Sequence, residues 1–96
     1  MEATKKQIKY QIELTGSFAK KGIGFSCMQK ALEMGITGKL EYINEGLIRI
    51  LVQGREKDIS EINTWFVKSP EIKTIKYHKV SVSNTHFNDF IIVNSI

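Results

Sequence analysis

Cysteine and proline are almost absent from this chain, which has one of each among its 96 residues. A single cysteine, Cys27, cannot form an internal disulfide bond, and proteins of a reducing compartment typically lack such bonds. One proline and seven glycines exclude the Pro-rich and Gly-rich compositions of disordered or fibrous chains. The composition therefore predicts an ordinary folded protein, and we expect it to be cytoplasmic.

Long hydrophobic runs are missing as well. No apolar stretch approaches the roughly 20 residues that a membrane-spanning helix needs. The polar and basic residues 1–9 are not followed by the apolar segment of a secretory signal. A length of 96 residues leaves room for one hydrophobic core, so we expect a single domain over residues 1–96 and no membrane partner.

Charge of one sign does not accumulate in long runs. The chain has 14 basic and 10 acidic residues and a net charge of +4. No run reaches the roughly five or six like charges of a nucleic-acid-binding arm. This pattern predicts a modest attraction to phosphate or another small anion and disfavours nucleic acid as a partner. His78 and His86 have no partner ligands at metal-binding spacing, so we expect no metal site.

Hydrophobic periodicity predicts the first strand and the first helix. Between residues 7 and 14, polar and apolar side chains alternate strictly, which is typical of a strand with one face in the core. Gly16 then opens a loop that runs to Gly24. A helix follows to about Met34, and four apolar residues at spacings of four, four and three share one of its faces: Ile23, Cys27, Ala31 and Met34. On that face Cys27 is expected to be a buried apolar residue rather than a nucleophile.

The middle of the chain predicts a hairpin and a second helix. Strands over residues 39–43 and 47–53 are joined by a turn in which Gly46 can take a positive φ angle. The segment Asp58-Ile-Ser-Glu61 matches a capping box, so we expect the second helix to begin there. Pro70 ends it.

Two further strands are predicted over residues 75–82 and 87–93. The alternation of the first slips between Tyr77 and Val80, which indicates either a bulge or an early end of the strand. The order of all elements predicts an α+β fold, a ferredoxin-like βαββαβ sandwich with an extra C-terminal strand. In this fold an antiparallel sheet has two helices on one face.

Several segments in this order resemble the acylphosphatase family. The best match is residues 31–46, Ala-Leu-Glu-Met-Gly-Ile-Thr-Gly-Lys-Leu-Glu-Tyr-Ile-Asn-Glu-Gly, where the family has Ala…Leu-Gly-Leu-Thr-Gly-Trp-Val-Arg-Asn-x-x-Asp-Gly. Residues 48–54, 65–70 and 90–92 are similar to three further family segments. The resemblance covers roughly residues 7–93. It implies the same fold and hydrolysis of acyl phosphates to carboxylate and phosphate without metal or cofactor.

The family's signature loop, Gly-Arg-Val-Gln-Gly-Val-Gly-Phe-Arg, is where this sequence departs. An ungapped match keeps the apolar helix face buried and places Gly24 at the final, catalytic arginine. Alternatively Gly22-Ile-Gly-Phe25 matches Gly-Val-Gly-Phe, with insertions and deletions, and Ser26 takes that position. The asparagine that orients the attacking water falls on Tyr42, whose alternation with Leu40 favours a packed ring. Both registers lose the arginine, so no catalytic residue is predicted.

The backbone of this loop could still bind an anion. A Gly-rich turn at a helix N-terminus points N–H groups outward, and the helix dipole favours negative charge there. The candidate anion-binding residues are Lys20, Lys21, Gly22, Ile23 and Gly24. In the other interpretation the glycines only permit a tight turn and the lysines are solvated. We therefore expect a non-catalytic acylphosphatase-like domain, a small binding or regulatory module; the alternative is a weak or altered acylphosphatase.

The sheet face away from the helices gives two predictions about partners. The third strand is expected to present Leu47, Arg49, Leu51 and Gln53 there. With Ile43, the two leucines form an apolar strip that could contact a protein partner or a second copy of the chain. RNA-recognition domains share this topology, but the exposed positions of the first and third strands carry no aromatic platform, which disfavours RNA.

Overall fold

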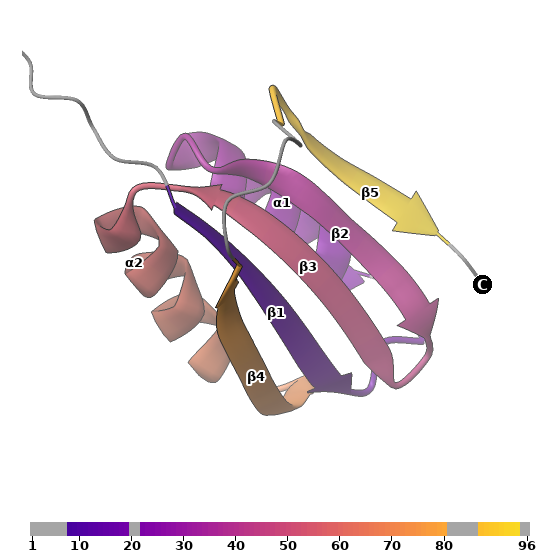
Figure 1. Cartoon of the computed structure of the whole chain (residues 1–96). Coiled ribbons are helices and arrows are strands. Elements are labelled where there is room, and N and C mark those ends of the chain that lie inside the picture. The colour runs from indigo at the N-terminus through magenta and orange to yellow at the C-terminus, as the bar shows by residue number, and fades with distance from the viewer. Residues whose placement is uncertain (1–7, 20–21, 81–86, 95–96) are drawn as a thin grey trace, which may run out of the picture.

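A five-stranded sheet with two helices on one of its faces makes up the fold (Figure 1). The computed structural model describes residues 8–19, 22–80 and 87–94. The elements are β1 (Ile8–Gly16), α1 (Gly22–Glu33), β2 (Thr37–Asn44), β3 (Leu47–Gly54), α2 (Glu56–Val67), β4 (Ile72–Val80) and β5 (Phe90–Asn94). This order confirms the predicted ferredoxin-like α+β sandwich with an extra C-terminal strand.

The strands lie side by side in the order β4-β1-β3-β2-β5. β1 pairs antiparallel with β3 and with β4, and β2 pairs antiparallel with β3. The extra strand β5 pairs parallel with β2, and Leu40 lies opposite Ile92. The sheet is therefore mixed, whereas the sequence predicted an antiparallel one. The reason is that β4 has the direction of β3, so the chain reverses after β4 and reaches the far edge in the direction of β2.

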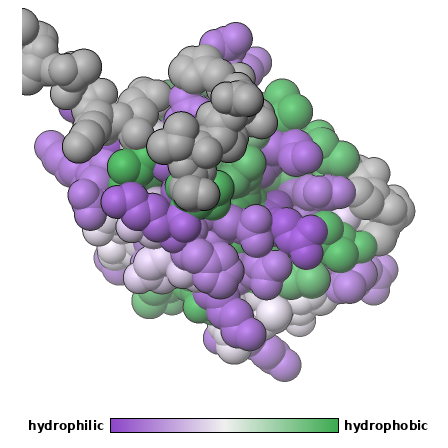
Figure 2. Space-filling view, in the orientation of Figure 1, coloured by the Kyte–Doolittle hydropathy of each residue, from purple (hydrophilic) through white to green (hydrophobic). Residues whose placement is uncertain are grey.

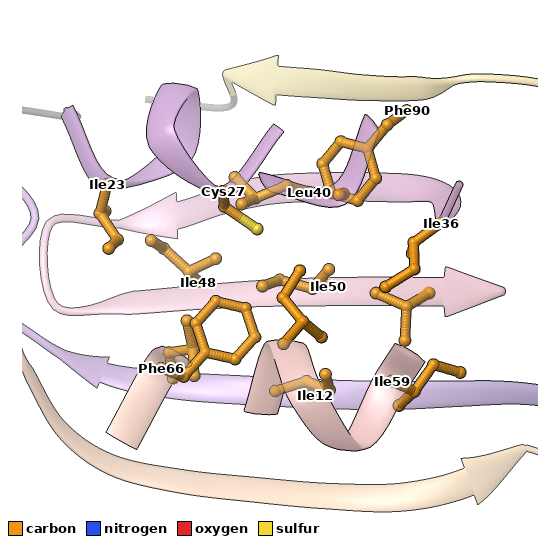
Figure 3. Close-up of a cluster of buried hydrophobic side chains, with 14 of the residues drawn as sticks. Ile12, Ile23, Cys27, Ile36, Leu40, Ile48, Ile50, Ile59, Phe66 and Phe90 are labelled. Carbon is orange, nitrogen blue, oxygen red and sulfur yellow. The ribbon is translucent and has the colours of Figure 1, made fainter. Parts of the chain in front are cut away.

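The hydrophobic core lies between the sheet and the two helices (Figure 3). The alternation of β1 turns Ile12 and Leu14 toward the helices, and the predicted face of α1 is buried at Ile23, Cys27 and Ala31. Burial of one such aliphatic side chain contributes about 1.5–3 kcal/mol. The largest fully buried side chains are Phe18, Phe66, Ile12, Leu14, Ile36, Leu40, Ile48, Ile50, Ile62 and Val52.

The second helix does not begin at the predicted capping box. α2 starts at Glu56, directly after Gly54 ends β3, and its N-cap residue Arg55 makes no side-chain cap hydrogen bond. Asp58 lies inside the first turn, where its carboxylate accepts a hydrogen bond from Arg55 Nε at 2.9 Å. A carboxylate is favourable there because of the helix dipole. No helix in the described part of the chain is long and apolar enough to cross a bilayer.

The strands differ from the predicted ones mainly at their ends. β4 begins at Ile72 and ends at Val80, and its pairing with β1 shows no register shift near Val80. The bulge, one of the two explanations for the slipped alternation, is therefore wrong; residues 81–82, on which the early end depends, lie outside the described part. β5 begins at Phe90, three residues later than predicted.

The turn between β2 and β3 is closed by a side chain. The Gly46 N–H donates to Asn44 Oδ1 at 2.8 Å, and Gly46 is not one of the glycines with positive φ. The positive φ predicted for Gly46 is therefore wrong, because the asparagine side chain closes the turn without it.

Candidate functional site

The loop after β1 is fastened to the protein by its own backbone. The N–H groups of Gly16 and Phe18 donate to carbonyl oxygens of the β2–β3 turn at 3.1 and 2.8 Å, and that of Ser17 donates to Glu71 O at 3.0 Å. A Cβ atom on Gly16 would collide with the same Glu71 oxygen, so glycine is required there. Phe18 is buried in the core. These three N–H groups therefore point at carbonyls rather than at a possible ligand.

The start of α1 contacts the end of β2 through one buried hydrogen bond. The Gly24 N–H donates to the Tyr42 hydroxyl oxygen at 2.9 Å. Tyr42 is 2% exposed, and its side chain is on the helix-facing side of β2 together with Leu40. The first N–H groups of a helix have no partner within the helix, so the tyrosine acts as a cap supplied by a distant strand.

The Tyr42 side chain also occupies the space that a side chain on Gly24 would need. A Cβ atom built on Gly24 would meet the Tyr42 hydroxyl oxygen and lie 2.9 Å from Tyr42 Cζ. A side chain at position 24 therefore requires the tyrosine ring to move. Burial raises the pKa of the Tyr42 phenol above its usual range, against the opposite effect of the hydrogen bond from Gly24. The phenol is consequently neutral at physiological pH.

Cys27 lies one helical turn beyond Gly24 and is fully buried, as predicted. Burial raises the pKa of its thiol to about 12. Because the thiolate is the nucleophilic form, this cysteine is inert at neutral pH.

The other candidate residues lie around the same helix start. Gly22 is exposed at the first position of α1, and Ile23 is buried in the core (Figure 3). Lys20 and Lys21 lie outside the described residues. Ser26, the alternative position for the family's arginine, is exposed on α1 and so differs from buried Gly24.

Sequence reasoning missed the contact itself. It identified Gly24 and Tyr42 separately, as two positions where family residues are replaced, and did not expect one to donate a hydrogen bond to the other. The available signal was that two residues serving one substrate in a family have to lie close together.

No three His, Cys, Asp or Glu side chains of the described ranges lie near enough to each other to hold a metal ion.

The open face of the sheet is mostly polar (Figure 2). Its residues Ile43, Leu47 and Leu51 are half-buried. Gln53 was expected on this face as an exposed residue, but it is 4% exposed and its Oε1 accepts a hydrogen bond from the Phe87 N–H at 3.5 Å. The chain just before β5 therefore covers part of this face. Its path could not be read from strand periodicity.

Comparison with known proteins identifies a family that matches most of the sequence. A family model described as Acylphosphatase matches residues 10–92. The sequence is similar to the acylphosphatase of Synechococcus sp. (strain CC9311), with 29% identity over 76 residues that make up 77% of this chain and 84% of the relative.

Two solved structures share the fold. An acylphosphatase from Coxiella burnetii has a TM-score of 0.80 at 18% identity, and the match covers 92% of this chain and 94% of that one. Full-length HypF in its phosphate- and nucleotide-bound form has a TM-score of 0.84 at 24% identity, and the match covers 99% of this chain but 13% of HypF. These likenesses establish the fold, and the family model spans most of the sequence. The chain belongs to the acylphosphatase family.

Proposed function

We propose that this chain is a non-catalytic member of the acylphosphatase family, a small binding or regulatory domain. The observation that carries the proposal is the hydrogen bond from Gly24 N–H to the Tyr42 hydroxyl, 2.9 Å long and buried. In the ungapped match these are the positions of the family's catalytic arginine and water-orienting asparagine. Here the Tyr42 hydroxyl is the hydrogen-bond acceptor of the Gly24 N–H, and the tyrosine ring fills the space beside Gly24.

The ungapped register is supported by two features of the helix. The face that it requires to be buried, at Ile23, Cys27 and Ala31, is buried. The two positions that it assigns to the family's arginine and asparagine are also in contact, as residues acting on one substrate have to be. Ser26, which the gapped register assigns to the arginine, is exposed and outside this contact.

The loss of the arginine has a clear physical consequence. Phosphoryl transfer depends on positioning and on hydrogen-bond donors aimed at developing negative charge. An arginine binds two phosphate oxygens through its planar fork and stays charged. Gly24 has no side chain, and its N–H already has an acceptor within the protein. Removal of one preorganised donor typically costs about 10²–10³ in rate.

Hydrolysis of a small acyl phosphate, measured as phosphate release, tests the proposal. We expect no turnover above the spontaneous rate for the wild-type chain. The double variant Gly24→Arg/Tyr42→Asn restores both family residues and removes the ring that a new side chain would meet. Its matched control is Ser26→Arg/Tyr42→Asn, which restores the arginine in the other register. Activity in the first variant alone supports the proposal and the ungapped register.

A second candidate function is a weak or altered acylphosphatase. It is favoured by the name of the similar Synechococcus protein, an acylphosphatase. Turnover of the wild-type chain at ordinary enzymatic rates would establish this candidate and refute the non-catalytic one. In that case Tyr42→Phe should change the rate, because the hydroxyl lies at the position of the family's asparagine.

Weak phosphate affinity and a cytoplasmic location are part of the proposal. Gly22 and Ile23 contribute the first N–H groups of α1, whose positive dipole end favours an anion. Lys20 and Lys21, which precede them, would add positive charge. Phosphate titration followed by backbone amide shifts tests this; no response of residues 22–24 up to millimolar phosphate would exclude the site.

A protein partner on the open face is the remaining part of the proposal. Ile43, Leu47 and Leu51 would make the apolar contact, with a second copy of the chain as the simplest partner. Light scattering on the wild type and on Leu47→Lys/Leu51→Lys tests self-association. If both are monomeric, this contact does not form between copies.

A further inference from the structure

A cavity of about 200 Å³ lies between α2 and the strands β1 and β4. Its base is apolar, at Ile12 and Ile59, and Tyr10 of β1 and Tyr77 of β4 form one wall. Ile12 and Tyr10 are four and six residues before Gly16, the end of β1, so the cavity is about 13–20 Å along the strand from the loop that leads to α1. It is therefore separate from the contact of Gly24 with Tyr42.

The tyrosine wall is suited to a planar molecule. The two rings are tilted by 54° with their centroids 6.0 Å apart. Tyr77 is 53% exposed, so much of its ring is accessible, whereas Tyr10 packs partly against the core. Aromatic ring faces are electron-rich and attract other rings and cations.

The opposite wall is polar and comes from one face of α2. Glu56, Ser60 and Asn63 are four and three residues apart, so they are neighbours along the helix surface. The Asn63 Oδ1 atom is buried and has no hydrogen-bond partner among the described residues. A buried acceptor without a donor is unfavourable, and proteins rarely keep one without a reason. A ligand N–H group would satisfy it once the Asn63 side chain turns this oxygen toward the cavity.

Charge and size narrow the class of ligand further. The described residues that line the cavity include one carboxylate, Glu56, and no lysine or arginine. Lys79, which lies opposite Tyr10 on β4, is not among them. An anion is therefore disfavoured. A dry cavity of roughly 150 Å³ holds a benzene ring, so the present volume is sufficient for one ring with a small substituent.

We infer that this cavity binds a single-ring planar molecule that carries N–H donors and no negative charge, such as an aromatic amide or amidine. The ring lies against Tyr77, an N–H group donates to Asn63 Oδ1, and the carboxylate of Glu56 faces any positive charge. The inference is independent of whether the chain hydrolyses acyl phosphates, because it uses none of the residues around Gly24.

Three probes with the same ring test the inference: benzamidine, benzamide and benzoate. Each is titrated into ¹⁵N-labelled protein, and backbone amide shifts are followed. We expect saturable shifts around Tyr77 and Asn63 with benzamidine, then with benzamide. Benzoate, which offers no N–H donor, should bind at least about fivefold more weakly, the equivalent of one hydrogen bond. No saturable response to benzamidine up to millimolar concentration, or equal affinity for benzoate, would overturn the inference.

Two variants and one control locate the binding. Asn63→Leu should weaken the binding of benzamidine about fivefold, because it removes the acceptor. Its melting temperature should stay the same or rise, because the unsatisfied oxygen is gone and leucine favours helix. Tyr77→Ala should weaken the binding of benzamidine about threefold to tenfold. Ile91→Ala, at a 47% exposed position on the far edge strand β5, should change nothing. Wild-type affinity in both cavity variants would refute the site.

Discussion

The two helices have the same length, but their first turns are stabilised differently. α1 and α2 both have 12 residues. α2 has two carboxylates in its first turn, Glu56 and Asp58, and Asp58 pairs with the preceding Arg55. α1 has no acidic residue in its first turn, and the Gly24 N–H donates instead to Tyr42 on β2. One helix start is stabilised by its neighbours in sequence, and the other by a distant buried residue.

This difference bears on the charge at the start of α1. An acidic first turn at α1 would repel an anion, and none is present. The buried tyrosine therefore stabilises the helix start without adding negative charge there. Since the contact of Gly24 with Tyr42 is buried and that of Asp58 with Arg55 is partly exposed, perturbing the first should cost more than perturbing the second.

The largest effect on stability is expected at alkaline pH and comes from Cys27 of α1. The pKa of the Cys27 thiol is raised by burial from 9.0 to about 12, so the folded chain keeps a proton that the unfolded chain loses. Its contribution to stability is complete below pH 9 and is lost as the pH rises toward 12, by about 1.4 kcal/mol per pH unit. Urea unfolding at several pH values should therefore show a flatter alkaline decline for Cys27→Ala. Equal slopes in both chains would contradict burial of the thiol.

Gly24→Ala should be next in size. The new Cβ meets the Tyr42 hydroxyl, and overpacking of this kind costs about 1–3 kcal/mol. The better helix propensity of alanine offsets up to about 1 kcal/mol of that cost. Urea unfolding at neutral pH measures the net loss.

The matched control for Gly24→Ala is a double-mutant cycle with Tyr42→Leu. Leucine lacks the outer part of the ring, so alanine at position 24 should be tolerated beside it. Strict additivity of the two single variants would mean that they do not share the same space.

Tyr42→Phe should cost about 1–2 kcal/mol, because the buried Gly24 N–H loses its acceptor while the ring stays. Amide hydrogen exchange should also become faster at Gly24 and remain unchanged in the middle of α2. Unchanged protection of Gly24 would show that the hydroxyl is not its acceptor in solution.

Asp58→Ala should have the smallest effect, about 0.5–1 kcal/mol, from the ion pair and the helix dipole. The side chain of Arg55 is 47% exposed and can be hydrated when its partner is removed. Thermal unfolding at low and at high salt should show that part of the loss disappears when charges are screened. If Asp58→Ala costs more than Tyr42→Phe, the ranking of the two helix starts is wrong.

Sequence periodicity was sufficient to predict the buried residues of an element where burial follows a local pattern. The alternation that buries Ile12 and Leu14 and the helical spacing of Ile23, Cys27 and Ala31 both depend on residues a few positions apart. The start of α2 was misplaced because Asp58 fits two roles. It matches the first residue of a capping box, yet it pairs backwards with Arg55.

Contacts that join distant parts of the chain could not be predicted from such local patterns. Gly24 and Tyr42 are 18 residues apart in sequence, and Phe87 and Gln53 are 34 apart. The parallel pairing of β5 with β2 depends on the path of the chain between two edges of the sheet. In the same way, the unpartnered oxygen of Asn63 becomes visible only once α2 is packed over β1 and β4.

The shared space of Gly24 and Tyr42 also constrains how this sequence can change over generations. A Cβ at position 24 fits beside the present tyrosine at position 42 only if the ring shifts. A larger residue at position 24, such as an arginine, would therefore be better tolerated after the tyrosine at position 42 had been replaced by a smaller residue. The two positions are thus expected to change together rather than one at a time.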